Sequence, residues 1–272
     1  MITVIIIPFF VLAFVVWRYR LLVSAENKLP VLMYHKVSLN QTDYLTVTAE
    51  QLDNQMQYLK KQGYWFVTMD NLHSRLRYRM PWAGKAILIT FDDAYQSTLD
   101  LAYPILKKHG VKATIFVPTF YIGWKSNWDD HPECLMSLES LKTIDRAVFE
   151  LGLHSHKHIN YGEMDGDELV DDFIANLDFF KEHGISHNFT FAYPYGGWYK
   201  DSDHRRKMKA FFVERYLQFA FRIGNTINRL PRANEELDLG GDYFEMTRID
   251  IRGTDSFNVF RWKVKFGRFN PF

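Results

Sequence analysis

The sequence has one cysteine in 272 residues, Cys134, so an internal disulfide is excluded and the redox compartment of the protein stays open. Charge of one sign is also missing, because 33 Lys and Arg nearly cancel 32 Asp and Glu and leave a net charge of +1. This balance gives no reason to expect nucleic acid as a partner. The chain has no repeat and no low-complexity linker. Its length suits one large domain or two small ones with an ample core.

Aromatic residues, by contrast, are abundant. The 7 Trp, 15 Tyr and 23 Phe make up 17% of a chain that is 47% hydrophobic. Such rings could stack on flat sugar faces, but packing in a core is their more common role, and we assign most of them to it.

One long apolar run stands at the start of the sequence. Met1–Trp17 carries no charge, and its length is near the short limit of roughly 17 to 25 residues for a membrane-spanning helix. A secretory signal peptide would carry positive charge before this run, whereas here the positive residues follow it, at Arg18, Arg20, Lys28 and Lys36. We therefore predict an uncleaved, single-pass transmembrane anchor over residues 1–22. The positive-inside rule places the rest of the chain, residues 23–272, in the cytoplasm, with the outer side of the membrane as the alternative.

Apolar, β-branched runs alternate with amphipathic stretches along the remaining sequence. Strands are predicted near residues 30–35, 64–68, 86–91, 112–117, 150–153, 189–192, 217–221 and 244–251. Helices are predicted near residues 49–62, 69–78, 98–109, 138–149, 167–181 and 203–216. Strands that alternate with helices form βα units and a parallel sheet. Roughly seven or eight such strands predict an α/β fold, a (β/α) barrel.

Polar side chains that can do chemistry follow several of these strands directly. Asp92 and Asp93 end the run at 86–91, and His154-Ser155-His156-Lys157-His158 follows the run at 150–153. Two adjacent carboxylates raise each other's pKa, and a divalent cation removes that cost. Two histidines and one carboxylate are a common ligand set for such a cation, which leaves the second carboxylate free to act as a base on water. The two segments together predict a hydrolytic metal site.

Each segment also has a structural interpretation. The Asp92-Asp93 pair could be a solvated turn, a histidine-rich stretch is usually surface, and Tyr193 and Tyr195 could be ordinary core aromatics. In a βα barrel, however, the carboxyl ends of the strands meet on one face, where such barrels build their sites. The convergence of several strand ends on that face favours the functional interpretation.

These segments resemble the polysaccharide deacetylase family, carbohydrate esterase family 4, whose NodB-like domain is a deformed barrel. Thr90-Phe91-Asp92-Asp93-Ala94 matches the family's first motif, Thr-Phe-Asp-Asp-Gly. His154-Ser155-His156-Lys157-His158 matches the second, His-Ser/Thr-x-x-His, and Phe191-Ala192-Tyr193-Pro194-Tyr195-Gly196 resembles the third, which ends in Pro-Tyr. The resemblance covers about residues 30 to 251 and implies that residues 23–272 form a catalytic domain of about seven strands.

The resemblance also implies roles for individual residues. Asp92 is expected to be the general base, and Asp93, His154 and His158 are expected to hold one divalent metal ion, Zn or else Co, Ni, Mn or Fe. In the third motif, the backbone N–H of Tyr195 is expected to meet the developing oxyanion, with Tyr193 beside the substrate. Ser155 is expected to orient a ligand.

The sequence departs from the family pattern at two places. Ala94 replaces the usual Gly of the first motif, which would require an ordinary backbone conformation there. The C-terminal Leu-x-His motif that supplies the general acid in many members is absent, since no histidine follows His204. His35 in Met33-Tyr34-His35 is similar to an early Tyr-His in biofilm poly-N-acetylglucosamine deacetylases and is expected to take that role, with a packed or capping histidine as the alternative. Arg248 is expected to keep Asp92 ionised, with a surface ion pair as the alternative.

The expected activity is metal-dependent removal of the N-acetyl group from an amino sugar of an envelope glycan. The tail Arg261–Phe269 interleaves cations with aromatics, a mixture that suits a membrane interface, with an exposed face of a barrel helix as the alternative. Beside the predicted anchor it favours a bacterial inner-membrane location and a lipid-linked substrate, such as a polyprenyl-phosphate-linked N-acetylhexosamine of lipopolysaccharide assembly. The alternatives are a periplasmic or extracellular enzyme acting on peptidoglycan or biofilm polymer, a deformylase of lipid-linked amino sugars, and a non-catalytic sugar-binding barrel.

Overall fold

The computed structural model describes residues 28–78, 80, 84–230 and 242–267. The anchor predicted over residues 1–22 lies outside this part of the chain. Within the described residues, no helix combines the length and the apolar character needed to cross a bilayer.

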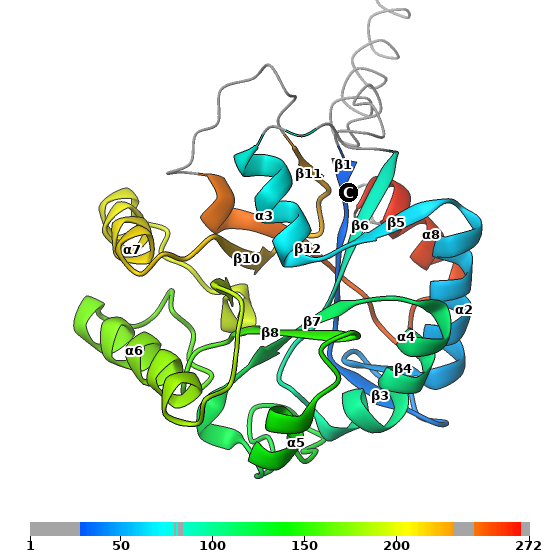
Figure 1. Ribbon diagram of the computed structural model, residues 1–272, viewed down its shortest axis with the longest axis horizontal. Helices are drawn as coiled ribbons and strands as arrows, with labels where there is room; N and C mark the ends of the chain where they lie inside the picture. The colour runs from blue at the N-terminus through cyan, green and yellow to red at the C-terminus, as the bar shows by residue number, and fades with distance from the viewer. Residues whose placement is uncertain (1–27, 79, 81–83, 231–241, 268–272) are drawn as a thin grey trace, which may run out of the picture.

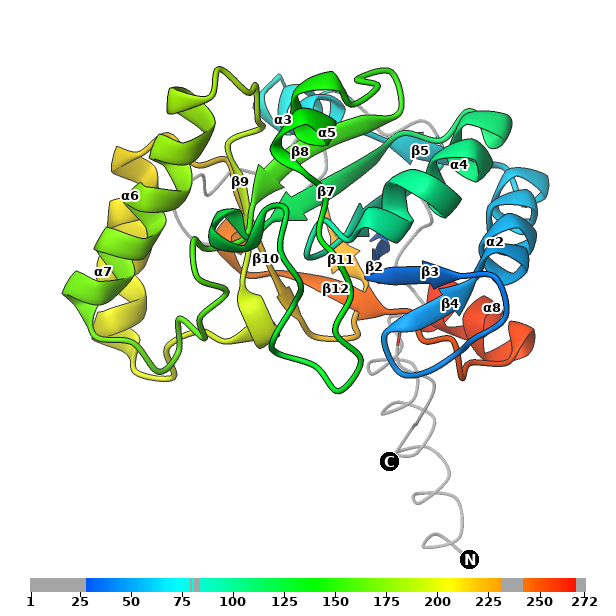
Figure 2. The same ribbon diagram turned by 90° about the horizontal axis from the view of Figure 1, so that it is seen from below.

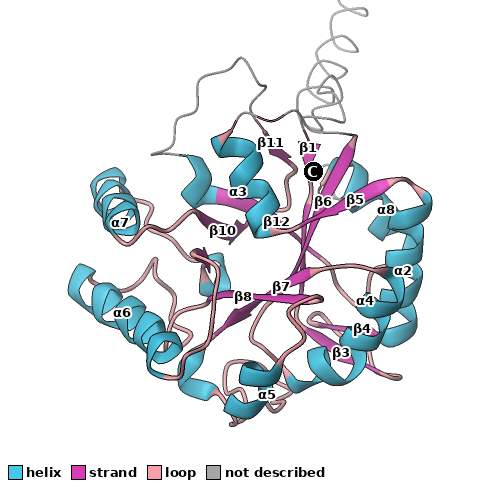
Figure 3. Cartoon of the chain, in the orientation of Figure 1, coloured by secondary structure: helices cyan, strands magenta, loops and turns pink. Residues whose placement is uncertain are grey.

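The described chain forms a parallel barrel (Figure 1, Figure 3). Its strands, in the order in which they pair, are β2 (Val31–Tyr34), β12 (Met246–Asp250), β10 (Phe219–Ile223), β9 (Thr190–Ala192), β8 (Phe149–Leu153), β7 (Ala113–Val117) and β6 (Lys85–Phe91). The ring closes because β2 pairs with β12 on one side and with β6 on the other. A further strand, β5 (Tyr64–Val67), pairs with the first half of β6. The barrel is deformed at β8 and β9, whose register holds one residue pair, Leu153 with Phe191. The predicted (β/α) barrel is confirmed.

Helices surround the barrel (Figure 2). They are α2 (Ala49–Lys61), α3 (Met69–Arg77), α4 (Tyr103–His109), α5 (Leu138–Thr143), α6 (Gly166–Glu182), α7 (Ser202–Glu214) and α8 (Phe257–Phe266). Two short pairings lie beside the barrel: β1 (Lys28–Leu29) with β11 (Asn228–Arg229), and β3 (Lys36–Ser38) with β4 (Thr46–Thr48). The helix α2 begins with a capping box, in which Thr48 Oγ1 accepts from Gln51 N at 3.0 Å and Gln51 Oε1 accepts from Thr48 N at 2.8 Å.

Alternate residues of the strands supply two separate cores, as the pleat of a strand requires. In β6, Ile87 and Ile89 belong to the cluster that packs under the helices, whereas Leu88 packs with Phe116 and Phe221. The Phe116 and Phe221 rings lie 5.9 Å apart although their strands, β7 and β10, are not neighbours in the sheet. Their contact therefore crosses the barrel, and aromatic side chains fill its interior.

Two predicted helices differ from the structure. The helix predicted to reach residue 149 ends at Thr143. The side chain of Asp145 stabilises a turn there, because its Oδ1 accepts from Ala147 N at 3.0 Å. Phe149 already begins β8. The helix predicted at 98–109 starts as a π-helical turn over Thr98–Ala102 and becomes α-helical only at α4, where Pro104 lies in the first turn. The tail forms α8, as the alternative interpretation of Arg261–Phe269 as a barrel helix required.

Candidate metal centre and active-site cleft

The predicted site residues meet in a cleft of about 540 Å³ at the carboxyl ends of the strands. They come from β2, β6, β8 and β9 or from the loops that follow these strands. The residues in the lining of the cleft that the sequence singled out are His35, Asp92, Asp93, His154, His158, Tyr193 and Tyr195. Arg248 lies behind the lining and is fully buried.

Three electron-pair donors converge at the base of this cleft. Asp93 Oδ1 lies 3.2 Å from His154 Nε2 and 3.1 Å from His158 Nε2, and one ligand atom from each of the three residues lies within 4.8 Å of the others. Among the described residues, Asp93 Oδ1 is buried and finds no partner with hydrogen-bond geometry. A buried carboxylate oxygen without a hydrogen bond is costly, and a cation held by the three atoms would remove that cost. The donor set therefore fits a divalent metal ion.

Neighbouring groups set the orientation of the two histidines. His154 Nδ1 lies 2.7 Å from the carbonyl oxygen of Ala192, so it carries the proton and leaves Nε2 with a free electron pair. The His158 ring stacks on Trp128, with centroids 4.1 Å apart, and Trp128 Nε1 donates to Asp93 Oδ2 at 3.3 Å. Trp128 thus touches two of the three candidate ligands.

The charges of the three groups are arranged to keep Asp93 ionised. Burial alone would raise the pKa of the Asp93 carboxyl, but His158 and His154 outweigh it and hold that pKa well below its ordinary value. Burial lowers the pKa of His158, while the pKa of His154 is raised because Asp92 and Asp93 outweigh its burial. A metal ligand set of this kind requires an ionised carboxylate and two neutral imidazoles, and the pKa shifts of Asp93 and His158 favour those states.

Left-handed backbone conformations orient the side chains of the candidate metal ligands. The φ angles of Asp93, Ala94, Ser155 and His158 are 71°, 53°, 68° and 53°. The expectation of an ordinary conformation at Ala94 is wrong, since this residue adopts the conformation that a glycine would adopt more easily. Such conformations persist only where surrounding contacts hold them in place.

A buried aspartate on α6 supplies part of those contacts. Asp172 accepts from the backbone N–H groups of His156 and Lys157 at 2.8 Å each, and from the hydroxyl of Tyr161 at 2.8 Å. The hydroxyl of Ser155 accepts from the N–H of Ile159 at 3.2 Å, so Ser155 fixes the same loop. Both side chains act on the histidine loop through its backbone.

Asp92 is held by a bidentate ion pair with Arg248. The guanidinium donates from Nη1 to Oδ1 at 2.5 Å and from Nη2 to Oδ2 at 2.7 Å, and both side chains are buried. Burial alone would raise the pKa of Asp92, but the charge of Arg248 outweighs it and lowers that pKa. The carboxylate also lies 3.8 Å from His154 Nε2, through its Oδ2 atom. Arg248 therefore keeps Asp92 ionised beside the candidate metal ligands.

The remaining predicted residues occupy different parts of the cleft. His35 follows β2, and its Nδ1 is buried without a hydrogen-bond partner among the described residues. Tyr195 has a φ of 57°, is 55% exposed, and its ring centroid lies 4.8 Å from that of His158. Tyr193 is fully buried and donates its hydroxyl to the carbonyl of Phe244 at 3.0 Å, so its polar end is engaged away from a substrate.

Residues 80–211 match the polysaccharide deacetylase family. This part of the chain, just under half of it, resembles a polysaccharide deacetylase domain. The metal-centre residues from β6 and β8 both fall inside the matched region, whereas His35 and Arg248 fall outside it.

Curated proteins and solved structures resemble this domain. YxkH of Bacillus subtilis (strain 168) is 27% identical over 175 residues, which are 64% of this chain and 59% of YxkH. A poly-beta-1,6-N-acetyl-D-glucosamine N-deacetylase of Staphylococcus aureus (strain MRSA252) is 29% identical over 195 residues, covering 63% of this chain and 66% of that protein. The similarity thus spans less than two thirds of either relative.

The fold is shared with IcaB from Ammonifex degensii, at a TM-score of 0.67 and 22% identity over 88% of this chain and 97% of that one. It is also shared with the Streptococcus pyogenes deacetylase PplD, solved with acetate, at a TM-score of 0.66 and 21% identity over 84% and 93% of the two chains.

The sequence missed several residues that complete the cleft. Trp128 lies in a stretch with no periodicity, and Asp172 lies in a helix with many other acids, so neither gave a local signal. Lys36 is buried and bonds Asp129 Oδ1 at 2.7 Å, and the Tyr95 hydroxyl donates to Asp129 Oδ2 at 2.8 Å. These contacts join segments 93 and 34 residues apart in the chain and hold the loop that carries Trp128.

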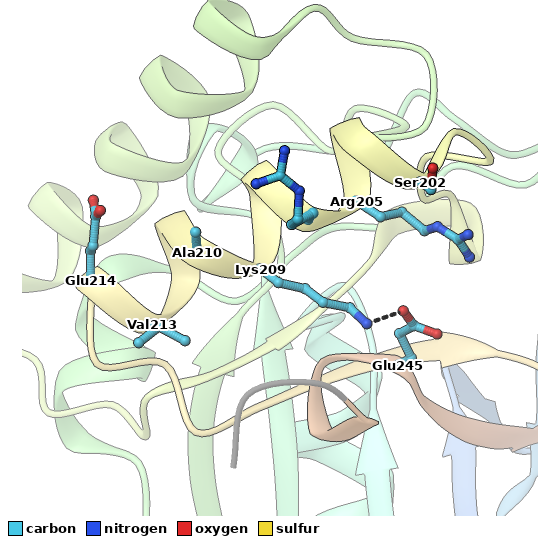
Figure 4. A pocket seen from close by; sticks show the side chains of 8 residues that line it. Ser202, Arg205, Lys209, Ala210, Val213, Glu214 and Glu245 are labelled. Atoms are coloured by element: carbon cyan, nitrogen blue, oxygen red, sulfur yellow. Dashed lines mark ion pairs between the residues drawn. The ribbon is translucent and has the colours of Figure 1, made fainter. Parts of the chain in front are cut away.

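A separate hollow of about 690 Å³ lies along α7 and contains none of the predicted catalytic or metal-binding residues (Figure 4). Its lining includes Arg205, Lys209 and Glu245, of which the last two form an ion pair that the figure marks with a dashed line. The predicted site residues thus line the cleft at the strand ends and not this hollow.

Proposed function

We propose that this protein is a metal-dependent N-deacetylase that hydrolyses the acetamide of an N-acetylated amino sugar in a bacterial envelope glycan. One observation carries the proposal: the Asp93, His154 and His158 donor atoms lie within 4.8 Å of one another beside an Asp92 that Arg248 holds ionised. A divalent cation bound there would polarise the amide carbonyl and make water more acidic.

The residues of the chain account for the proton transfers. Asp92, buried and ionised, is the base that removes a proton from the attacking water. His35 reaches the same cleft from β2 and is proposed to protonate the leaving amine. The backbone N–H of Tyr195, in the turn after β9, is proposed to donate to the oxyanion.

Features of the cleft support a sugar substrate. Tyr195 and Tyr44 are 55% and 53% exposed and line the cleft together with Trp128, and exposed aromatic rings suit the flat faces of sugars. The name of the Staphylococcus aureus relative supports a polymer of N-acetylglucosamine. A polyprenyl-phosphate-linked N-acetylhexosamine of lipopolysaccharide assembly is the other substrate that the sequence favoured. An assay of acetate release by purified protein, with each acceptor in turn, distinguishes these two substrates.

The decisive variant is Asp92→Asn. We expect acetate release to fall about 100- to 10,000-fold, the range for loss of a general base, while bound metal measured by atomic emission stays at its wild-type level. Unchanged acetate release would contradict the assignment, and absence of release by the wild type on every acceptor would favour a sugar-binding barrel. Formate in place of acetate would identify a deformylase.

The side of the membrane is a separate question. We propose that the domain is attached to the inner membrane by residues 1–22 and faces the cytoplasm, because the basic residues follow the apolar run. Reporter fusions after Phe272 that are active only in the periplasm or only in the cytoplasm test this proposal, and periplasmic activity would favour the extracellular alternative.

A further inference from the structure

A second groove, of about 680 Å³, lies at the end of the barrel opposite the cleft. Its wall includes Pro30, Tyr64 and Lys85, at or just before the first residues of β2, β5 and β6. The catalytic cleft, by contrast, is lined by residues at the carboxyl ends of strands. Because all strands of the barrel are parallel, the two hollows lie at opposite ends of it.

The charge of this groove has one sign. Its described lining includes Lys28, Lys85, Arg261 and Lys265 and no aspartate or glutamate. Burial and the nearby charge of Lys265 lower the pKa of Lys28, so two of the cations repel each other across the groove. The neighbouring Lys263 is different, since it turns inward and pairs with Asp255 at 2.6 Å. We call the groove lined by Lys28, Lys85, Arg261 and Lys265 the basic groove.

Aromatic rings accompany these cations. The Arg261 guanidinium lies 5.6 Å from the Tyr58 ring centroid, and the Lys85 ammonium lies 5.6 Å from that of Tyr64. Trp262 of α8 is 38% exposed in the same wall. Cations beside amphipathic aromatic rings match the interfacial region of a bilayer, where rings lie at headgroup depth and cations meet lipid phosphates.

The position of Lys28 in the sequence also favours a lipid bilayer as the partner of the basic groove. Lys28, in its lining, follows the uncharged Met1–Trp17 run by 11 residues, and Arg18 and Arg20 lie between them. A segment of that apolar character would bring this end of the barrel, and not the cleft, close to a bilayer.

We propose that the basic groove is a docking surface for an anionic lipid bilayer, with lipid phosphates between its four cations. The catalytic cleft then faces away from the bilayer, so the substrate would be a glycan that extends from the membrane rather than a headgroup at its surface. This docking does not depend on the proposed catalysis.

The test measures how full-length protein partitions onto vesicles of phosphatidylcholine alone and of phosphatidylcholine mixed with phosphatidylglycerol. The apolar N-terminal run would bind both, so the ratio of the two partition coefficients reports the groove. We expect Lys85→Gln with Arg261→Gln to lower this ratio about 25-fold, from about fivefold for each basic residue near an anionic surface. Lys28→Gln with Lys265→Gln should lower it to a similar extent, as should about 1 M salt for the wild type.

The matched control removes two exposed cations from another face. Arg206→Gln with Lys207→Gln changes the same net charge on α7, beside the hollow in Figure 4, and should leave the ratio near its wild-type value. Equal losses in the control and groove variants, or an unchanged ratio in both groove variants at wild-type melting temperature, would overturn the proposal. Binding of soluble polyphosphate through these residues, without a preference for anionic vesicles, would overturn it in favour of a polyanion site.

Discussion

At the scale of single residues, the Arg248–Asp92 pair decides how the cleft can work. Both side chains are buried, so each depends on the other for its charge to be tolerated. In protein freed of metal, we expect Arg248→Met to lower the free energy of unfolding by about 3–5 kcal/mol, because it leaves an unpaired buried carboxylate. Denaturant unfolding of Arg248→Met, Asp92→Asn and the double variant measures this. Additive losses in the double variant would show that the two residues are not coupled.

A second residue-scale prediction concerns pH and the loop that carries Trp128. Burial alone would raise the pKa of Asp129, but the hydrogen bonds from Lys36 and Tyr95 outweigh it and lower that pKa. The stabilising contribution of Asp129 is therefore complete above its unfolded pKa of about 3.9 and is lost as the pH falls through the lower folded pKa. We expect Lys36→Met to raise the pKa of Asp129, so that the loop loosens at a higher pH.

Hydrogen-exchange protection of residues 124–134, followed as the pH is lowered, measures this loosening. Lys125→Met removes an exposed cation from the same loop and is the control, which should follow the wild type. Loss of protection at the same pH in the Lys36 variant and the wild type would show that the ion pair does not hold the loop.

At the scale of elements, helix α6 supports the histidine loop from outside the barrel. Asp172 accepts two backbone N–H groups of that loop, and an asparagine would turn an N–H₂ group toward one of them. We expect Asp172→Asn to weaken metal binding about 10- to 100-fold, the range for partners that orient ligands. Chelator competition measures the affinity, and activity should recover at saturating metal if the loop is only misplaced.

The adjacent residue offers a matched control for this variant. Asp171 is exposed on the same helix, so Asp171→Asn should leave the metal affinity unchanged. An Asp172→Asn protein with wild-type affinity would mean that the loop keeps its left-handed conformations without this carboxylate.

At the scale of the whole molecule, the barrel brings together donor atoms from two strands that are not neighbours. Asp93 follows β6, whereas His154 and His158 follow β8, and β7 lies between these strands in the sheet. An unfolded chain cannot hold these donors together, so metal binding should stabilise the folded state. At a metal concentration about 100 times the Kd the gain is about 2.7 kcal/mol, which raises the melting temperature by about 5–10 °C for a domain of this size. Calorimetry with metal and with chelator measures it, and Asp93→Asn should abolish the rise.

Much of the fold and the centre of the site could be predicted because their signals are local. Apolar runs such as Ile87–Phe91 followed by Asp92 and Asp93 predicted a strand with carboxylates at its end, and parallel pairing then required those ends to meet. The sequence therefore determined the barrel and the grouping of Asp93, His154 and His158. It missed the early end of α5, because the turn at Asp145 competes with a continuing helix pattern.

Only the tertiary structure decided how these residues are held. The left-handed conformation of Ala94, the hydroxyl of Tyr193 turned toward Phe244, and the support from Asp172 and Trp128 all depend on contacts between distant segments, which leave no periodic mark in the sequence. The tertiary structure likewise decided that the basic and aromatic residues of α8 gather at the opposite end of the barrel from the cleft. Periodicity fixes which face of a strand or helix is buried, whereas packing fixes which partner each side chain meets.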